Sequence, residues 1–147
     1  MDKDSLIRER AKRIVAEEGS VRFPQLDLRY KWKTMTLFTE RYLDLDVVHL
    51  DKVYEYGDGS TFTPDISALD DDVEIIIMLK TQEGLLWDMS ALESNKRLIL
   101  EIDLTQIDGD VESDELYDRV ITSVDNKRWL YHPHELSGLQ HMVGSVI

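Results

Sequence analysis

The chain lacks cysteine and long apolar runs. Its 147 residues include no Cys, and the longest apolar run is Ile75–Leu79. The absence of cysteine excludes disulfide scaffolds, thiolate metal sites and thiol nucleophiles, and a run of this length is far short of the ~20 residues that span a bilayer. The first twenty residues are rich in charge and contain no apolar block. We therefore expect no signal peptide, no membrane association and a cytoplasmic location.

The common motifs of catalysis and nucleotide binding are also missing. None of the seven glycines belongs to a G-x-x-x-x-G-K or G-x-G-x-x-G loop, and no serine lies in a G-x-S-x-G turn. The backbone amides that such loops aim at phosphate groups are therefore not indicated, nor is a nucleophile elbow. Because no set of catalytic residues can be specified, the sequence favours a non-catalytic protein and predicts no cofactor.

Acidic residues outnumber basic ones, and the imbalance is uneven. The chain has 30 acidic and 17 basic side chains, a formal charge of −13. Residues 1–41 contain ten basic and seven acidic side chains, whereas residues 42–147 contain seven basic and twenty-three acidic ones. The acidic remainder should repel nucleic acid and anionic membranes, so the charge favours a protein partner or self-association. A solvated surface that keeps the protein soluble is the simplest explanation of the acidic excess.

The length predicts a single domain over residues 1–147. Apolar residues at helical spacing predict an N-terminal helix over Asp4–Glu18, which ends before Gly19, and a second helix over Asp114–Val124. Pro64 and the Asp70–Asp72 run indicate an exposed loop. Strands are predicted at Tyr30–Thr39, Val47–Tyr56, Val73–Thr81 and Arg97–Leu104, from alternation or from enrichment in β-branched and aromatic residues.

Two of these strands suggest how the sheet is built. Val73–Thr81 is apolar at most positions, as expected of a central strand that is buried on both faces. Arg97–Leu104 alternates, which predicts that Glu101 and Asp103 face solvent. Short turns between the strands favour antiparallel pairing. The predicted fold class is α+β, a mainly antiparallel sheet of four to six strands with an N-terminal and a C-terminal amphipathic helix packed on one face.

An aromatic and basic stretch stands out near the N-terminus. Arg29, Tyr30, Lys31, Trp32 and Lys33 are consecutive, and Arg41 lies nearby. Such interleaving can stack nucleic-acid bases and neutralise phosphates. Two alternatives are that the aromatic residues form the buried side of a strand, or that the stretch docks on an acidic protein surface. Long-range repulsion from the rest of the chain disfavours nucleic acid, so we predict a partner-binding surface.

Clustered acids form a second candidate surface. Asp70, Asp71 and Asp72 are consecutive, and Asp108 and Asp110 precede the second predicted helix. These carboxylates can act as an acidic decoy that occupies the phosphate sites of a protein that handles DNA or RNA. They are the acidic members of the predicted partner-binding set.

Three histidines near the C-terminus form the one cluster suited to metal chemistry. His132 and His134 are two residues apart, so on an extended segment both imidazoles lie on one side, and Glu135 or His141 could complete the shell. The alternative is that they are partly exposed loop residues. A divalent metal held here would support a hydrolase or nuclease.

These observations leave two classes of function. The first and favoured class is a non-catalytic binding protein, namely an adaptor, an inhibitor or an assembly subunit, with a composition typical of accessory proteins of phages and mobile elements. Within this class, one version is a head-to-tail homo-oligomer and another is the acidic nucleic-acid mimic. The second class is the metal-dependent hydrolase.

Overall fold

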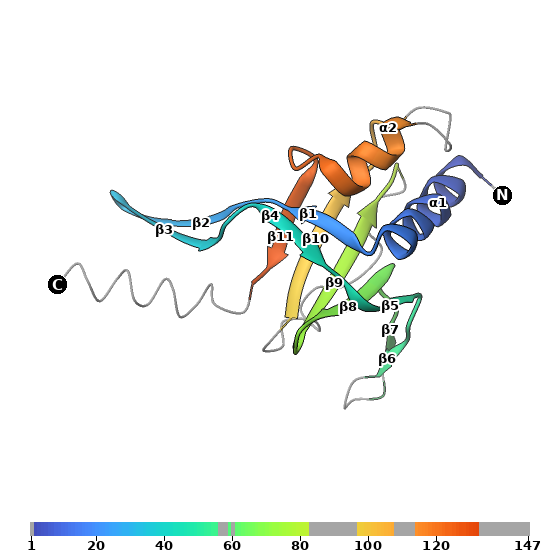
Figure 1. The fold of residues 1–147 in the computed structure, drawn as a ribbon, viewed down its shortest axis with the longest axis horizontal. Coiled ribbons are helices and arrows are strands. Elements are labelled where there is room, and N and C mark those ends of the chain that lie inside the picture. The colour runs from blue at the N-terminus through green and yellow to red at the C-terminus, as the bar shows by residue number, and fades with distance from the viewer. Residues whose placement is uncertain (1, 56–58, 60, 83–96, 108–113, 133–147) are drawn as a thin grey trace.

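The computed structural model describes residues 2–55, 59, 61–82, 97–107 and 114–132 (Figure 1). Its helical segments are α1 (Lys3–Glu18), α2 (Asp114–Tyr117) and the π-helical η2 (Asp118–Thr122). Its strands are β1 (Ser20–Phe23), β2 (Leu26–Tyr30), β3 (Lys33–Phe38), β4 (Arg41–Asp44), β5 (Asp46–Leu50), β6 (Tyr54–Glu55), β7 (Thr61–Phe62), β8 (Ile66–Asp70), β9 (Val73–Lys80), β10 (Arg97–Asp103) and β11 (Lys127–Tyr131).

Helix α1 lies where its apolar periodicity predicts. Asp2 caps its start, because the Asp2 carboxylate accepts the backbone N–H of Ser5 at 2.8 Å. Gly19 ends it in the left-handed conformation, with φ of 69°, which costs a glycine little. Apolar side chains three and four residues apart are buried against the core. No helix within the described ranges has the length and apolar character that a membrane crossing requires.

A five-stranded mixed sheet forms the centre of the molecule. Its strand order is β11-β10-β9-β8-β5, and β9 pairs with β10 in parallel while the other neighbours are antiparallel. Residues Ile75 to Leu79 of β9 are all buried. Alternate residues of β9 belong to two apolar clusters, one shared with α1, α2 and η2 and a smaller one that includes Phe62 and Ile99. The prediction of a central strand buried on both faces is confirmed.

The predicted fold class is wrong. The sheet is mixed, because the connection from Lys80 to Arg97 is long enough to return the chain in the same direction, whereas short turns had indicated a meander. The second helical segment has only nine residues, the last five of which are π-helical, and β11 follows it. Within the described residues, the sheet is therefore not covered by a pair of amphipathic helices from the two ends of the chain.

Two local predictions also fail. Ile66–Asp70, which follows the predicted loop at Pro64, is the buried strand β8. Glu101 is 4% exposed, because β10 has neighbours on both sides and is covered on both faces. Its carboxylate accepts a hydrogen bond at 3.0 Å from Arg128 of β11. The alternating pattern of this interior strand therefore does not mean that the Glu101 carboxylate faces solvent.

A bent β-ribbon carries the chain out of this body. β1 pairs with β4 and β2 pairs with β3, so the two antiparallel ladders follow one another along the same pair of chain segments. Figure 1 shows β2 and β3 extending away from the sheet and helices. We call the segment from Leu26 to Phe38 the arm. The strand predicted over Tyr30–Thr39 is wrong at its start, because the turn of the arm lies at Lys31 and Trp32.

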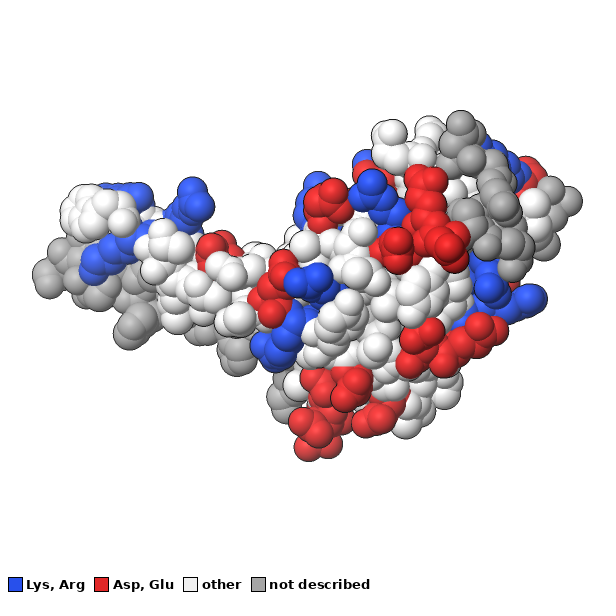
Figure 2. All heavy atoms as spheres, turned by 45° about the horizontal axis from the view of Figure 1, so that its top comes forward, with Lys and Arg blue, Asp and Glu red and all other residues white. Residues whose placement is uncertain are grey.

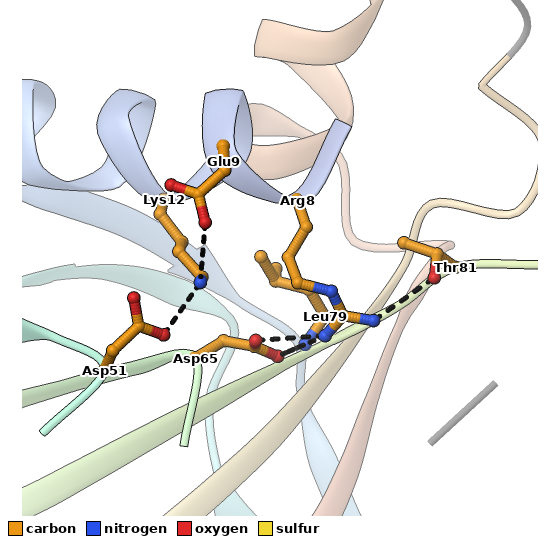
Figure 3. A network of polar contacts seen from close by, with 7 residues as sticks. All are labelled: Arg8, Glu9, Lys12, Asp51, Asp65, Leu79 and Thr81. Atoms are coloured by element: carbon orange, nitrogen blue, oxygen red, sulfur yellow. Dashed lines mark hydrogen bonds and ion pairs between the residues drawn. The ribbon is translucent and has the colours of Figure 1, made fainter. Parts of the chain in front are cut away.

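Charged side chains fasten α1 to the sheet (Figure 3). Arg8 Nη1 lies 3.0 Å from both carboxylate oxygens of Asp65, and Arg8 Nη2 donates to the Thr81 hydroxyl at 3.2 Å. Asp65 also accepts the backbone N–H of Leu79 at 2.8 Å. One helical turn further on, Lys12 Nζ lies 2.8 Å from Asp51. These contacts connect α1 to the start of β8, the end of β9 and the end of β5.

Candidate partner-binding surface

The base of the arm is held by packed aromatic rings. Phe23 of β1 and Phe38 of β3 are buried, and their ring centroids lie 5.6 and 5.0 Å from that of Trp129 in β11. The Trp129 indole N–H donates to the carbonyl oxygen of Pro24 at 2.8 Å. Tilted aromatic pairs at these distances add to the stabilisation from apolar burial. The arm therefore leaves the body from a fixed base.

One cross-strand and one local hydrogen bond meet at Asp27, close to the base of the arm. The Thr36 hydroxyl of β3 donates to the Asp27 carboxylate of β2 at 2.8 Å, and the Gln25 amide donates to the same carboxylate at 3.0 Å. These two hydrogen bonds favour the charged form and lower the pKa of Asp27 below its ordinary value. Asp27 thus has one hydrogen-bond partner within the arm, Thr36, and one directly before it, Gln25.

The tip of the arm presents an exposed tryptophan among cations. Trp32 is 77% exposed, and Arg29 and Lys31 are also exposed. Lys31 has a φ of 55°, the left-handed conformation that a two-residue hairpin turn requires, although no glycine is present. Lys31 Nζ lies 5.6 Å from the ring centroid of Tyr30. The arm thus places an indole and positive charges at the end of a projection.

This combination is suited to protein recognition. Tryptophan, tyrosine and arginine are the residues that most often dominate binding energy at protein interfaces. A Trp side chain this exposed has little contact with its own chain, so burying it in a partner gains most of its apolar area. Figure 2 shows Lys and Arg gathered at the end of the arm, whereas many Asp and Glu side chains lie on the body.

The structure separates the predicted basic residues into two places. Arg29, Tyr30, Lys31, Trp32 and Lys33 are together at the tip. Arg41 begins β4 beyond the base of the arm, and its guanidinium carbon lies 4.1 Å from the ring centroid of Phe38. At ~3.3 Å per residue, Arg41 is roughly 25 Å along the ribbon from Lys33. Its cation supports the base of the arm rather than the tip.

The predicted acidic set is only partly described. Asp70 ends β8, and Asp71 and Asp72 form the tight turn into β9. Asp108 and Asp110 lie outside the described residues, so their relation to this turn stays a prediction, as does the acidic decoy that depends on it. The turn belongs to the body and not to the arm.

The metal hypothesis can be followed at one residue. His132 is buried just after β11, with its ring centroid 5.6 Å from that of Trp129. His134 and His141 lie outside the described residues. No group of three or more metal-binding side chains comes together in the part of the chain that the structure describes. His132 contributes to the aromatic base of the arm, and its role as a metal ligand stays a prediction.

A surface hollow of about 300 Å³ lies beside the end of β10. Among its lining residues, Arg119 pairs with Asp125 at 3.0 Å, and the Asn126 amide donates to the carbonyl oxygens of Asp103 and Arg119. These polar groups hold η2, β10 and the turn before β11 together. The described lining of this hollow has no histidine and no hydroxyl nucleophile.

The sequence pattern identified the residues at the tip, but it did not predict the projecting hairpin that carries them. The turn lacks the Asn-Gly or Asp-Gly pair that usually identifies a two-residue hairpin. The partner of Phe23 and Phe38 is Trp129, more than ninety residues later in the sequence. A sign was nevertheless present: Pro24 and Gln25 interrupt the apolar pattern where β1 passes into the arm.

Comparisons with family models, with curated proteins and with solved structures found no match to this chain.

Proposed function

We propose that this chain is a non-catalytic binding protein that engages an acidic surface of a protein partner through the tip of its arm. The observation that carries the proposal is Trp32, which is 77% exposed at the end of a projecting hairpin and is flanked by Lys31 and Lys33. A large apolar side chain in water carries a free-energy cost that binding would remove.

The basic residues indicate the character of the partner. Arg29 and Lys31 are exposed at the tip, so their charges are accessible to carboxylates on another protein. Complementary charge speeds association and selects among partners, while the buried aromatic anchor supplies most of the affinity. We therefore expect a partner that offers an apolar depression bordered by Asp and Glu.

Nucleic acid is the competing ligand for such a hairpin, since exposed aromatic and basic side chains can stack on the bases of a single strand and neutralise its phosphates. The charge of the chain argues against it. Residues 42–147 carry twenty-three acidic and seven basic side chains, so the body would repel phosphates that the tip attracts. A protein partner with a local acidic patch avoids this repulsion when the arm alone makes contact.

Fluorescence anisotropy with two labelled probes tests the proposal. One probe is a glutamate-rich peptide with a central leucine, and the other is a single-stranded oligonucleotide of equal charge. We expect wild-type protein to bind the peptide more tightly than the oligonucleotide. Trp32→Ala and the double variant Arg29→Glu/Lys31→Glu should each weaken peptide binding at least about tenfold.

The matched control is Arg13→Glu/Lys52→Glu, which makes the same change in net charge at two exposed positions on the body. It should bind the peptide within about twofold of wild type if the arm is the binding surface. Tighter binding of the oligonucleotide, no binding of either probe, or an equal loss in the control and arm variants would overturn the proposal.

A further inference from the structure

A second charged surface lies at the far end of the ribbon from the arm. In the β1–β4 ladder, Phe23 and Arg41 are at the arm end, and Ser20 pairs with Asp44 at the opposite end. The chain then passes through Leu45 into β5. The arm and the start of β5 are therefore separated by the length of the β1–β4 ladder.

Five carboxylates gather where the ribbon meets the sheet. Asp46 of β5 pairs with Leu69 of β8, which Asp70 follows directly. Because paired residues on adjacent strands lie about 5 Å apart, the end of β4, the start of β5 and the β8–β9 turn share one corner of the molecule. We call this surface the acidic corner. Its members are Asp44, Asp46, Asp70, Asp71 and Asp72.

The acidic corner resembles what the tip would recognise. Val47 is 61% exposed next to Asp46, and Val73 is exposed next to Asp72, so apolar surface lies among the carboxylates. No Lys or Arg occurs in residues 42–51 or 64–79, the segments that build the corner. Within the described residues, these five carboxylates make no ion pair. The corner is thus a negative surface with exposed apolar side chains next to two of its carboxylates.

The tip cannot reach the acidic corner of its own chain. Trp32 and Asp44 are separated by twelve residues of ribbon, about 40 Å at ~3.3 Å per residue. The arm also extends away from the sheet that carries the corner (Figure 1). Contact between the two surfaces must therefore be made between molecules.

We infer that the partner of the arm is a second copy of this chain, with the tip of one copy seated on the acidic corner of the next. This inference rests on the proposed function and names its partner. The two surfaces differ, so the contact is head-to-tail and repeats into a ring or a filament. A tip contact buries a small area, so association is weak and depends on protein concentration and salt.

Charge reversal tests this inference. The arm-reversed variant carries Arg29→Glu and Lys31→Glu, and the corner-reversed variant carries Asp46→Lys and Asp72→Lys. Asp71 is left unchanged because its φ is 52°, which lysine adopts less readily than Asp or Asn.

Sedimentation velocity over a range of concentrations gives the mass of each protein. At about 0.1 M salt we expect wild type to assemble, and each single-surface variant to need at least about tenfold more protein to do so. A mixture of the two variants should form a 1:1 pair, because the wild-type tip of the corner-reversed variant can still bind the wild-type corner of the arm-reversed variant. At about 1 M salt, where charges beyond ~3 Å are screened, association of wild type should weaken.

The outcomes distinguish the two proposals. A wild-type chain that stays monomeric at low salt, or an assembly that either single reversal leaves unchanged, overturns the self-association inference. The same holds if a mixture of the two variants forms no pair. If the arm still binds the acidic peptide in those cases, only the identity of the partner is wrong. If wild-type protein does not bind the acidic peptide, the proposed function is overturned as well.

Discussion

Trp129 donates its indole N–H to the carbonyl oxygen of Pro24 at 2.8 Å, which joins β11 to the point where β1 passes into the arm. The two residues are far apart in the sequence, and the bond fixes the direction in which the arm leaves the body. Phe23 and Phe38 pack against the same indole ring. The position of the tip therefore depends on packing at the base.

We predict that Trp129→Phe lowers the free energy of unfolding modestly and that Trp129→Ala lowers it strongly. Phenylalanine keeps much of the ring packing but removes the donor to Pro24, a loss of about 1 kcal/mol in the free energy of unfolding. Alanine also removes the ring contacts with Phe23 and Phe38, and should cost about 3 kcal/mol. Urea unfolding measures both values. A loss below about 1 kcal/mol for Trp129→Ala would show that the aromatic base is not a stabilising cluster.

Substitutions at the tip should leave stability unchanged. Trp32 is exposed and Lys31 is at the turn, so Trp32→Ala and Arg29→Glu/Lys31→Glu should change the free energy of unfolding by less than about 0.5 kcal/mol. Thermal and urea unfolding of the variants used in the binding experiments provide the measurement. A larger loss would mean that the tip packs within its own molecule.

The loss in the free energy of unfolding when the ion pair between Arg8 and Asp65 is broken should depend on which partner is removed. The Arg8 side chain is 25% exposed and that of Asp65 is 9% exposed. Arg8→Met leaves a nearly buried carboxylate without its cation, and should cost about 3 kcal/mol. Asp65→Asn leaves a cation that water can still reach and keeps an oxygen for the Leu79 N–H, so it should cost less. Arg13→Met, at an exposed position of the same helix, is the control for loss of an arginine.

Urea unfolding of these three variants at pH 7 gives the order of their losses. We expect Arg8→Met to lose the most and Arg13→Met to stay within about 0.5 kcal/mol of wild type. A larger loss for Asp65→Asn than for Arg8→Met would contradict the argument that the carboxylate is the more deeply buried partner.

Lys127 should make stability depend on pH above neutrality. Its ammonium group donates to the carbonyl oxygens of Arg22 at 2.8 Å and Ile121 at 3.3 Å. Burial, and secondarily the charge of Arg22, lowers the pKa of Lys127 from 10.5 to about 7. Between these pKa values the unfolded chain holds the proton and the folded protein does not. The free energy of unfolding should therefore rise as pH increases from 7 toward 10.5, and fall as pH decreases through the same range.

Comparison with Lys127→Met isolates this residue from the other groups that titrate in the same range. The difference in unfolding free energy between wild type and variant should rise with pH between 7 and 10, with a slope of at most about 1.4 kcal/mol per pH unit. Urea unfolding at several pH values measures the slope. A difference that is constant across the range would mean that Lys127 keeps its ordinary pKa in the folded protein.

Sequence predicted best where the controlling forces are local. The apolar spacing of α1 and the left-handed Gly19 act within a few residues, and the continuous apolar run of β9 is typical of a strand without a solvent face. For the candidate site, sequence identified the residues from Arg29 to Lys33. It could not show that their turn lies at the end of a free hairpin, because no glycine indicates that turn.

Partner strands and their directions are non-local, and these predictions failed. The sequence of β10 does not predict that β9 lies beside it in parallel, or that Arg128 of β11 hydrogen-bonds to Glu101. Alternation assigns residues to two faces of a strand, but tertiary structure decides whether either face reaches water.

By itself, the sequence determined the chemistry of this protein: a cysteine-free chain, an aromatic and basic segment near the start, and a strongly acidic remainder. Only the tertiary structure decided where that chemistry is presented. Packing of Trp129 against Phe23 and Phe38 directs the basic segment outward, and pairing of β5 with β8 brings Asp46 beside Asp70. Both depend on contacts between segments that are distant in the chain, because burial and strand pairing depend on which residues are close in space rather than on which are close in sequence.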